Sequence, residues 1–353
     1  MKRSQMPILL ITFFLLVKGL SAQEGPQFEG WYTRIVDTKK QLSVAIIGGS
    51  FLAKNEIFSP VALLPGYLAI IFNDEKNNKI EIYEEFPHQT KILSDGMPVL
   101  GHNQYSGSST YSWSALGYGE IAHDHIDLEI PGVIEIHSWI SSFDAFPGQA
   151  YKAHRFLKIK EPIRWYVYSM GSKTNYDIKI DRDNSWQLYQ GDGYAHQEKN
   201  WGMAFPHKWI WMQAISADHT KKLALSGGVV NLLDLIPIKA SAVGIKTDKI
   251  NWYFPPLSLS NRITYKVDPC QKKVKLTARS AKRKLQISAW ATSDSFVPVS
   301  IPTKKGFQKN GGIESFSAHI TVAAFEKNVL QEMIHFENAA LEFGGDYMKC
   351  ATK

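Results

Sequence analysis

The residues that could do chemistry are concentrated in one stretch, 193–211, which reads GYAHQEKNWGMAFPHKWIW. Titratable and amide side chains stand there among aromatic rings, as in a pocket that binds an apolar molecule through a few placed polar groups. The alternative is an aromatic β corner in which Glu198 and Lys199 are simply solvated. The members of this group are His196, Glu198, Lys199, Asn200, Trp201, Phe205, His207, Trp209 and Trp211.

A second such stretch, Phe28-Glu29-Gly30-Trp31-Tyr32, lies near the start of the chain. A glycine between an acid and two rings indicates that the backbone comes close to another group at the start of a strand. The stretch therefore adds one acid and further rings to the candidates.

The elements that must position these residues are predicted to be strands. Period-two alternation of apolar and polar residues recurs along the chain, most cleanly at 79–85. Within 208–216, Trp209, Trp211 and Gln213 fall on one face of the predicted strand. No segment shows a long, capped helical period, although 326–336 could form a short helix.

Many short strands separated by turn signals predict an all-β protein, with more strands than one small barrel holds. We therefore expect two consecutive β-barrel or sheet units with little helix. After a separate segment at 1–22, these units are predicted at 23–160 and 161–353. The break is placed at 158–162, a run that contains two lysines and a proline.

Residues 1–22 have the features of a signal peptide. Lys2 and Arg3 precede a short apolar run, and Ala22 is a small residue suited to cleavage before Gln23. The run is short for a membrane span. We therefore predict a secreted or periplasmic protein, with an uncleaved membrane anchor as the alternative.

The chain contains two cysteines, Cys270 and Cys350. In an oxidising compartment an even pair can form a disulfide. Such a bridge and two separate buried thiols are both open from the sequence, and cysteines so far apart do not predict a metal site.

The charge of the chain is mild. The formal charge is +7, and removing the three basic residues of 1–22 leaves +4. Lysine and arginine are scattered except at 272–284, whereas a nucleic-acid protein concentrates them on one face. No nucleic-acid partner is expected. The basic run is interpreted as a solvated strand pair, with contact to an anionic membrane surface as the alternative.

A metal site is conceivable only at His123 and His125, which stand two residues apart beside Asp124 and Asp127. On a strand, this spacing places both imidazoles on one face. Because no third ligand is evident, we interpret them as exposed polar residues and predict no metal.

Three motifs occur here in an order that resembles the tocopherol cyclase family. They are FEGWY at 28–32, EKNWG at 198–202 with FPHKWIWMQ at 205–213, and ALEFGGDY at 340–347, and the Pro302-Thr303 pair also fits. The resemblance spans residues 28–347, and 95–160 departs most. Relatives of that family include bacterial lipocalin-like carotenoid hydratases, so the resemblance implies two lipocalin-like units.

Tocopherol cyclases close a chromanol ring without a cofactor. They protonate an olefin of a prenyl chain, and the phenol oxygen traps the tertiary cation. This chemistry needs an acid in an apolar setting, ring faces toward the cation and little water. The resemblance therefore implies a hydrophobic small-molecule substrate, a prenylquinol or another isoprenoid, and no cofactor.

The resemblance also suggests roles for residues of this chain. Glu198 is the first choice as the acid or as the group that orients it, although Lys199 could instead pair with Glu198 and keep it ionised. Asn200 could hold the phenol. The candidate acids are Glu198, Asp192, His196, His207 and Glu29, and the candidate substrate-binding residues are Trp31, Tyr32, Lys199, Asn200, Trp201, Phe205, Trp209, Trp211 and Gln213.

Two other functions stay open at this point. A hydratase would use the same protonation step but add water to the cation. A lipocalin-like carrier would bind a hydrophobic ligand without changing it. An acid that points into an apolar cavity favours either enzyme, and acids that point to solvent favour the carrier.

Overall fold

The computed structural model describes residues 27–52, 64–94, 111–141, 143–147, 163–232, 236–256, 258 and 260–350. Regular structure in these ranges is strand, apart from the short 3-10 helix η2 (Ser293–Ser295), so the all-β prediction is confirmed. No helix in these ranges could cross a bilayer. The signal-peptide prediction for 1–22 lies outside the described residues.

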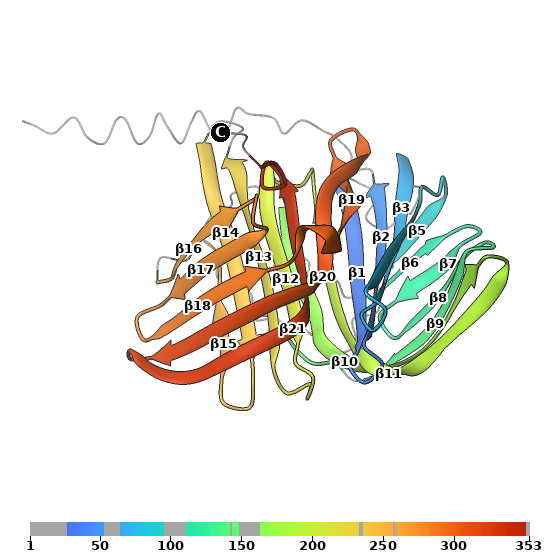
Figure 1. The fold of residues 1–353 in the computed structure, drawn as a ribbon. Coiled ribbons are helices and arrows are strands. Elements are labelled where there is room, and N and C mark those ends of the chain that lie inside the picture. The colour runs from blue at the N-terminus through green and yellow to red at the C-terminus, as the bar shows by residue number, and fades with distance from the viewer. Residues whose placement is uncertain are drawn as a thin grey trace, which may run out of the picture.

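The first sheet is antiparallel throughout, with the strand order β4-β3-β2-β1-β11-β10-β9-β8-β7-β6-β5 (Figure 1). Its strands are β1 (Gln27–Asp37), β2 (Leu42–Leu52), β3 (Leu64–Asp74), β4 (Lys79–Glu85), β5 (Thr90–Ser94), β6 (Tyr111–Ala115), β7 (Gly119–Ala122), β8 (His125–Ile130), β9 (Ile134–Ser141), β10 (Ile163–Arg182) and β11 (Ser185–Gly202).

The second sheet has the order β15-β14-β13-β12-β21-β20-β18-β17-β16, and β19 pairs with β20 beside this path. Its strands are β12 (Lys208–Ile215), β13 (Lys222–Leu232), β14 (Ile236–Lys246), β15 (Asn251–Phe254), β16 (Arg262–Asp268), β17 (Lys273–Arg279), β18 (Arg283–Trp290), β19 (Phe296–Thr303), β20 (Gly306–Glu326) and β21 (Val329–Gly345).

The two sheets share one topology. In each, the first and last strands of the run lie side by side, β1 beside β11 and β12 beside β21, and two strands consecutive in the chain form the edges. A meander that returns to its first strand is typical of a lipocalin-like unit. Two such units were predicted, but the chain changes sheet between Gly202 and Lys208 rather than near 160. The reason is that β11 pairs with β1 and β10 pairs with β11.

Each sheet encloses an apolar core of its own. In the first unit, β5 and β6 pack across β2, where Ser50 bonds Thr90 at 2.6 Å and accepts a bond from the Trp113 indole at 2.9 Å. This curls the sheet around a core that includes Trp31, Ile70 and Ile136. The second unit has a separate core, and a third apolar cluster lies between the two units. The contact between the units is therefore built from the outer faces of their central strands.

Two local predictions differ from the structure. The segment 326–336 is not helical, because residue 326 ends β20, residues 327–328 turn, and residues 329–336 belong to β21. His123 and Asp124 lie in a bend between β7 and β8 rather than on one continuous strand. The strands β8 and β9 form a hairpin around Pro131 and Gly132.

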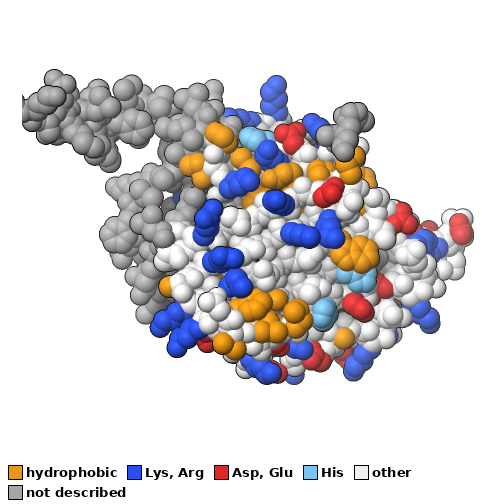
Figure 2. Space-filling model, turned by 60° about the vertical axis from the view of Figure 1, so that its left-hand side comes forward, with side chains coloured by type: hydrophobic (Ala, Val, Ile, Leu, Met, Phe, Trp, Pro, Cys, Tyr) orange, Lys and Arg blue, Asp and Glu red, His pale blue; other side chains and the backbone are white. Residues whose placement is uncertain are grey.

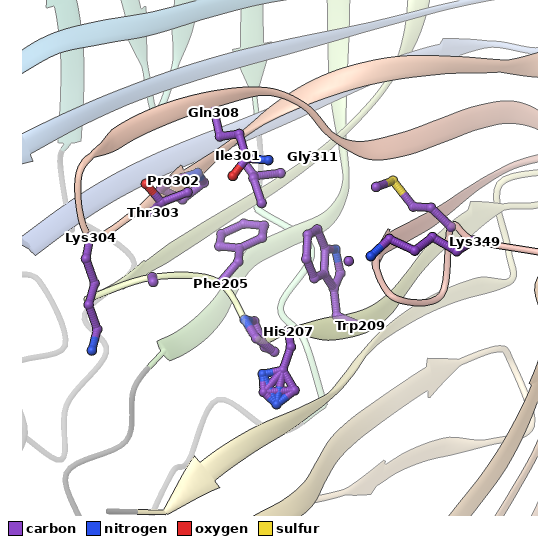
Figure 3. Close-up of a pocket in the computed structure, with 14 residues that line it drawn as sticks. Phe205, His207, Trp209, Ile301, Pro302, Thr303, Lys304, Gln308, Gly311 and Lys349 are labelled. Atoms are coloured by element: carbon purple, nitrogen blue, oxygen red, sulfur yellow. The ribbon is translucent and has the colours of Figure 1, made fainter. Parts of the chain in front are cut away.

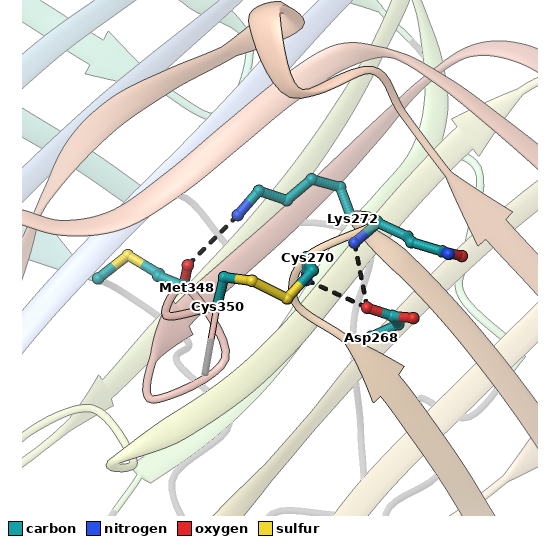
Figure 4. The surroundings of a disulfide bond; sticks show 6 residues. Asp268, Cys270, Lys272, Met348 and Cys350 are labelled. Atoms are coloured by element: carbon teal, nitrogen blue, oxygen red, sulfur yellow. Dashed lines mark hydrogen bonds between the residues drawn. A yellow bond between two sulfur atoms is a disulfide. The ribbon is translucent and has the colours of Figure 1, made fainter. Parts of the chain in front are cut away.

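Cys270 and Cys350 form a disulfide, which settles the choice that the sequence left open. Their Cα atoms are 4.7 Å apart although 80 positions separate them in the chain. Figure 4 shows the bridge joining the segment after β21 to the turn between β16 and β17, where Lys272 also donates a bond to the Met348 carbonyl at 3.3 Å. The end of the described chain is thus tied to the second sheet.

Candidate active site

The two faces of the central pair β1 and β11 carry different polar groups. Tyr32 lies opposite Glu198 and Arg34 lies opposite His196, and all four side chains point toward the second unit. On the opposite face, Lys199 bonds Glu29 at 2.7 Å inside the first unit. Glu198 and Lys199 therefore point to opposite faces of β11, and the two do not pair with each other.

Three glutamates meet between the units. Glu314 of β20 and Glu342 of β21 are cross-strand partners in the second sheet. Glu314 accepts a bond from the Tyr32 hydroxyl at 2.8 Å. Glu342 accepts a bond from the Trp209 indole at 2.6 Å, and Glu198 accepts one from the Trp211 indole at 3.1 Å. We call Glu198, Glu314 and Glu342 the acid cluster.

Burial raises the pKa of two members of this cluster, Glu314 and Glu342. Desolvation raises the pKa of Glu342 to about 7; the bond from Trp209 opposes this rise, and the charge of Glu198 adds to it. Desolvation, followed by the charge of Glu342, raises the pKa of Glu314 well above its ordinary value. Burial therefore favours the protonated form in the pair formed by Glu314 and Glu342.

Accessibility differs within the cluster. Glu198 and Glu314 are buried, whereas Glu342 keeps some accessible surface although it lies deep among protein atoms. Glu342 is therefore the most accessible member of the cluster.

The tryptophans of β12 hold two of the glutamates. Trp209 and Trp211 stand two residues apart, so both indoles point to the same side of the strand, toward the first unit. The ring of Trp209 lies across Gly344 of β21, where any Cβ atom would overlap it. Glycine at this position is what lets Trp209 lie flat and reach Glu342.

Arg34 connects the two units beside the acid cluster. Its guanidinium donates to Gln213 at 2.9 Å, to the Asn338 carbonyl at 2.8 Å and to Ser43 at 3.2 Å. It also lies 4.6 Å from the ring centre of Phe316. The buried cation is therefore held by both sheets, and it offsets part of the negative charge of the cluster.

Polar atoms without partners also point into this region. The Nδ1 atom of His196, the Nε2 atom of Gln213 and the Nε1 atom of Trp165 are buried and have no hydrogen-bond partner among the described residues. His196 bonds Glu198 through its other nitrogen at 2.9 Å. Since buried polar groups normally have partners, these atoms are available to water or a ligand between the units.

A cleft of about 420 Å³ opens beside Trp209, which is a volume within the usual range for ligand sites. Figure 3 shows Phe205 and Trp209 side by side in it, with Ile301 and Pro302 close by. The ring centres of Phe205 and Trp209 are 5.1 Å apart. Because Trp209 also bonds Glu342, one side chain joins the cleft to the acid cluster.

The residues predicted for the site fall into three groups. Those at the junction of the units or in the cleft are Glu198, His196, Tyr32, Asn200, Phe205, Trp209, Trp211 and Gln213. Those on the opposite face of β1 and β11 are Glu29, Trp31, Lys199 and Trp201. Those exposed to solvent are Asp192 and His207.

These positions reduce the number of candidate acids. Asp192 and His207 are exposed and lie outside the acid cluster, although His207 also lines the cleft. Glu29 is bonded to Lys199, whose ammonium lies 4.7 Å from the Trp31 ring centre. Of the predicted acids, Glu198 and His196 remain with the cluster.

Sequence reasoning missed Glu314, Glu342 and Arg34. Glu342 stands within the ALEFGGDY motif, and Glu314 alternates with apolar neighbours in GGIESF. A lone acid on the inward face of an otherwise apolar strand was the available signal. Arg34 follows FEGWY by two positions and carried the same signal.

No group of three or more potential metal ligands occurs among the described residues. His123 contacts Asp124 at 3.5 Å, and His125 contacts the same carboxylate at 2.8 Å. These side chains are partly exposed and lie far along the first sheet from the acid cluster.

Two lipocalin-like units with buried acids and indoles at their junction define an all-β protein with a candidate active site between the units. The family model for tocopherol cyclase-like proteins matches residues 150–345. The chain therefore belongs to the tocopherol cyclase-like family, which supports an enzyme of the cyclase or hydratase kind. No curated protein matches the chain.

Solved structures of CghA share this fold at low identity. The crystal structure of CghA with Sch210972 matches with a TM-score of 0.60 and 12% identity, over 91% of this chain and 88% of that chain. Kievitone hydratase from Nectria haematococca matches with a TM-score of 0.48 and 10% identity, over 91% and 89% of the two chains. At such identities the likeness concerns the fold alone.

Proposed function

We propose that this protein protonates a double bond on the prenyl chain of a phenol or quinol and closes a chromanol-type ring, with Glu342 as the proton donor. The observation that supports this most is the carboxyl of Glu342. It is the most accessible carboxyl of the acid cluster, it is bonded to an indole, and burial raises its pKa to about 7. A carboxyl group with that pKa is partly protonated at neutral pH and can act as a general acid.

The reaction balances without a cofactor. The proton of Glu342 forms a C–H bond with the π electrons of the alkene, which leaves a tertiary cation at the neighbouring carbon. A lone pair of the phenol oxygen then forms the C–O bond, and the phenol proton passes to a base. Glu198, held by Trp211 and His196, is the base of this proposal, and the product is an isomer of the substrate.

The indoles have a role in the same step. A carbocation is stabilised by the electron-rich face of an aromatic ring, and Trp209 and Trp211 flank the acid cluster. Asn200 lies on this side of β11, with its Oδ1 atom 2.9 Å from where a Cβ atom on Gly30 would be. We propose that Asn200 holds the phenol hydroxyl and that the cleft beside Phe205 receives the prenyl chain.

Hydration is the second candidate. The cleft opens to solvent at Lys304 and Gln308, which are both exposed, so water could reach a cation formed near Trp209. A hydratase would use Glu342 in the same way and differ only in the nucleophile.

The test is incubation of the purified protein with a geranylated hydroquinone, followed by mass spectrometry. A cyclase gives a product of unchanged mass and different retention, whereas a hydratase adds the mass of one water. We expect Glu342→Gln to lower the rate at least about 100-fold. The matched control is Glu337→Gln, an exposed residue of the same strand, which should keep full activity.

Two results would refute the proposal. The first is recovery of the hydroquinone bound but unchanged by the wild-type protein, which is the behaviour of a carrier. The second is full activity in Glu342→Gln, which would remove this residue as the donor. Glu198→Gln and Glu314→Gln then identify whether another member of the acid cluster supplies the proton.

A further inference from the structure

One face of the second sheet is strongly basic. The outward residues of β16, β17 and β18 are in register, so that Lys266 lies beside Lys275 and Arg262 lies beside Arg279. Figure 2 shows lysine and arginine dominating the view that brings these strands forward. The cations of this face are Arg262, Lys266, Lys273, Lys275, Arg279 and Lys284.

The other titratable groups on the same face do not cancel this charge. Asp268 caps the following turn by accepting bonds from the backbone of residues 270 and 271. Glu337 is exposed on β21, and the two histidines, His319 and His335, carry no negative charge. This face therefore carries six cations and two carboxylates. The basic run at 272–284 lies at its centre.

Apolar side chains lie on the same face. Leu330 and Met333 of β21 are each 49% exposed, and Trp290 of β18 is 42% exposed. Leu330 lies opposite Phe325, which in turn lies opposite Lys284. Large apolar groups therefore stand directly beside cations rather than on a separate part of the molecule.

We propose that this basic face docks on the surface of an anionic lipid bilayer. Cations attract the charged headgroups, and exposed leucine, methionine and tryptophan side chains gain by entering the interface between headgroups and acyl chains. A second copy of this chain is a poor partner, since two copies of the face would repel each other. A nucleic acid would use the cations but leave Leu330 and Met333 in water.

The experiment is sedimentation of the full chain with vesicles. Vesicles of phosphatidylcholine alone are compared with vesicles that also contain phosphatidylglycerol, at low and high salt. The variant Lys275→Glu with Arg279→Glu removes two cations from the face. The matched control, Lys91→Glu with Lys173→Glu, makes the same charge change on exposed residues of the first sheet.

We expect binding only to the anionic vesicles and its loss at high salt. Partition should fall about five-fold for each cation removed, or more for charge reversal, in the variant of the basic face. The control pair should bind as wild type does. Replacing Leu330 and Met333 by serine should also weaken binding, since these side chains would no longer enter the interface.

The proposal fails if both kinds of vesicle bind equally, or if the two charge variants lose binding equally, because net charge would then be the cause. It also fails if the lipid partition survives the Lys275 and Arg279 changes. Displacement from vesicles by a short duplex DNA, with tighter binding to that DNA, would mark a nucleic-acid surface instead. Should the first variant not fold, Arg262→Glu with Lys266→Glu tests the same face.

Discussion

Trp209 and Glu342 form the contact on which the proposed chemistry depends. The indole donates to the carboxyl, and this bond holds the pKa of Glu342 lower than burial alone would. The negative charge of Glu198 acts in the opposite direction and raises this pKa. The acid strength of the site is thus set by a few neighbours that come from both units.

We expect the rate of turnover to fall as the pH rises through about 7, because only protonated Glu342 can give its proton. In Trp209→Phe, turnover should begin to fall at a higher pH than in the wild type, because the hydrogen bond that lowers the pKa of Glu342 is lost. A pH–rate profile of both proteins measures this. Turnover that increases with pH above 7 would contradict the assignment of Glu342 as the acid.

Residue identity was partly predictable at this scale. Glu198, Trp209 and Trp211 were selected because acids and rings crowd one short stretch of sequence. Glu314 and Glu342 were not, since each stands alone in a long strand and gains its significance from a partner on the neighbouring strand. The alternation of side chains along the strand predicted the correct face for Gln213. It did not predict which residues contact Gln213 on that face.

At the scale of elements, the junction depends on how closely β12 and β21 approach. Gly344→Ala would place a methyl group in the Trp209 ring, so the ring must turn and release Glu342. We expect a large loss of turnover with a stability loss of about 1–3 kcal/mol. The control is Gly171→Ala, whose Cβ would meet only the flexible end of Lys222. Equal activity in the two variants would contradict this role of Trp209.

Arg34 ties β1 to both β12 and β21. Replacing it with methionine keeps most of its length but removes four polar contacts, counting the Phe316 ring, and leaves Gln213 without its donor. We expect a loss of roughly 3–5 kcal/mol in the free energy of unfolding. Denaturant titration measures it, with exposed Arg262→Met as the control. A change below about 1 kcal/mol would show that the junction does not rely on this cation.

The strands themselves were largely predictable, and their pairing was not. Alternation marks β4 and β9 because each has one apolar face, whereas β12 is buried on both faces. The pairing of β1 with β11 joins residues about 170 positions apart, such as Glu29 and Trp201, and nothing local specifies it. For this reason the boundary between the two units was predicted too early in the chain. A basic run with a proline can precede a strand of either sheet, so it does not mark where the chain changes sheet.

At the scale of the molecule, the disulfide links the cleft to the second sheet. Met348 and Lys349 line the cleft, and Cys350 fixes them to the turn after β16. We expect Cys270→Ser with Cys350→Ser to lower stability by roughly 4 kcal/mol on the chain-entropy model and to weaken substrate binding. Urea titration with and without reductant measures the first effect. Unchanged stability would contradict a structural role for the bridge.

The bridge also supports export. Disulfides persist in oxidising compartments, so we propose that the protein works outside the reducing cytoplasm, in agreement with the signal peptide predicted at 1–22. Reaction with an apolar substrate at a membrane would connect the acid cluster of the junction with the basic face of the second sheet. Each of these two proposals can fail without the other.

The most direct test of the central claim is turnover in D₂O. Glu342 exchanges its proton for deuterium, so protonation of an alkene must leave one deuterium on carbon, where it does not wash out. We expect a cyclised product that keeps a single deuterium after return to H₂O, as read by mass spectrometry, and no such product from Glu342→Gln. A converted product without deuterium, or a hydroquinone recovered unchanged, would contradict proton transfer to carbon as the function of this site.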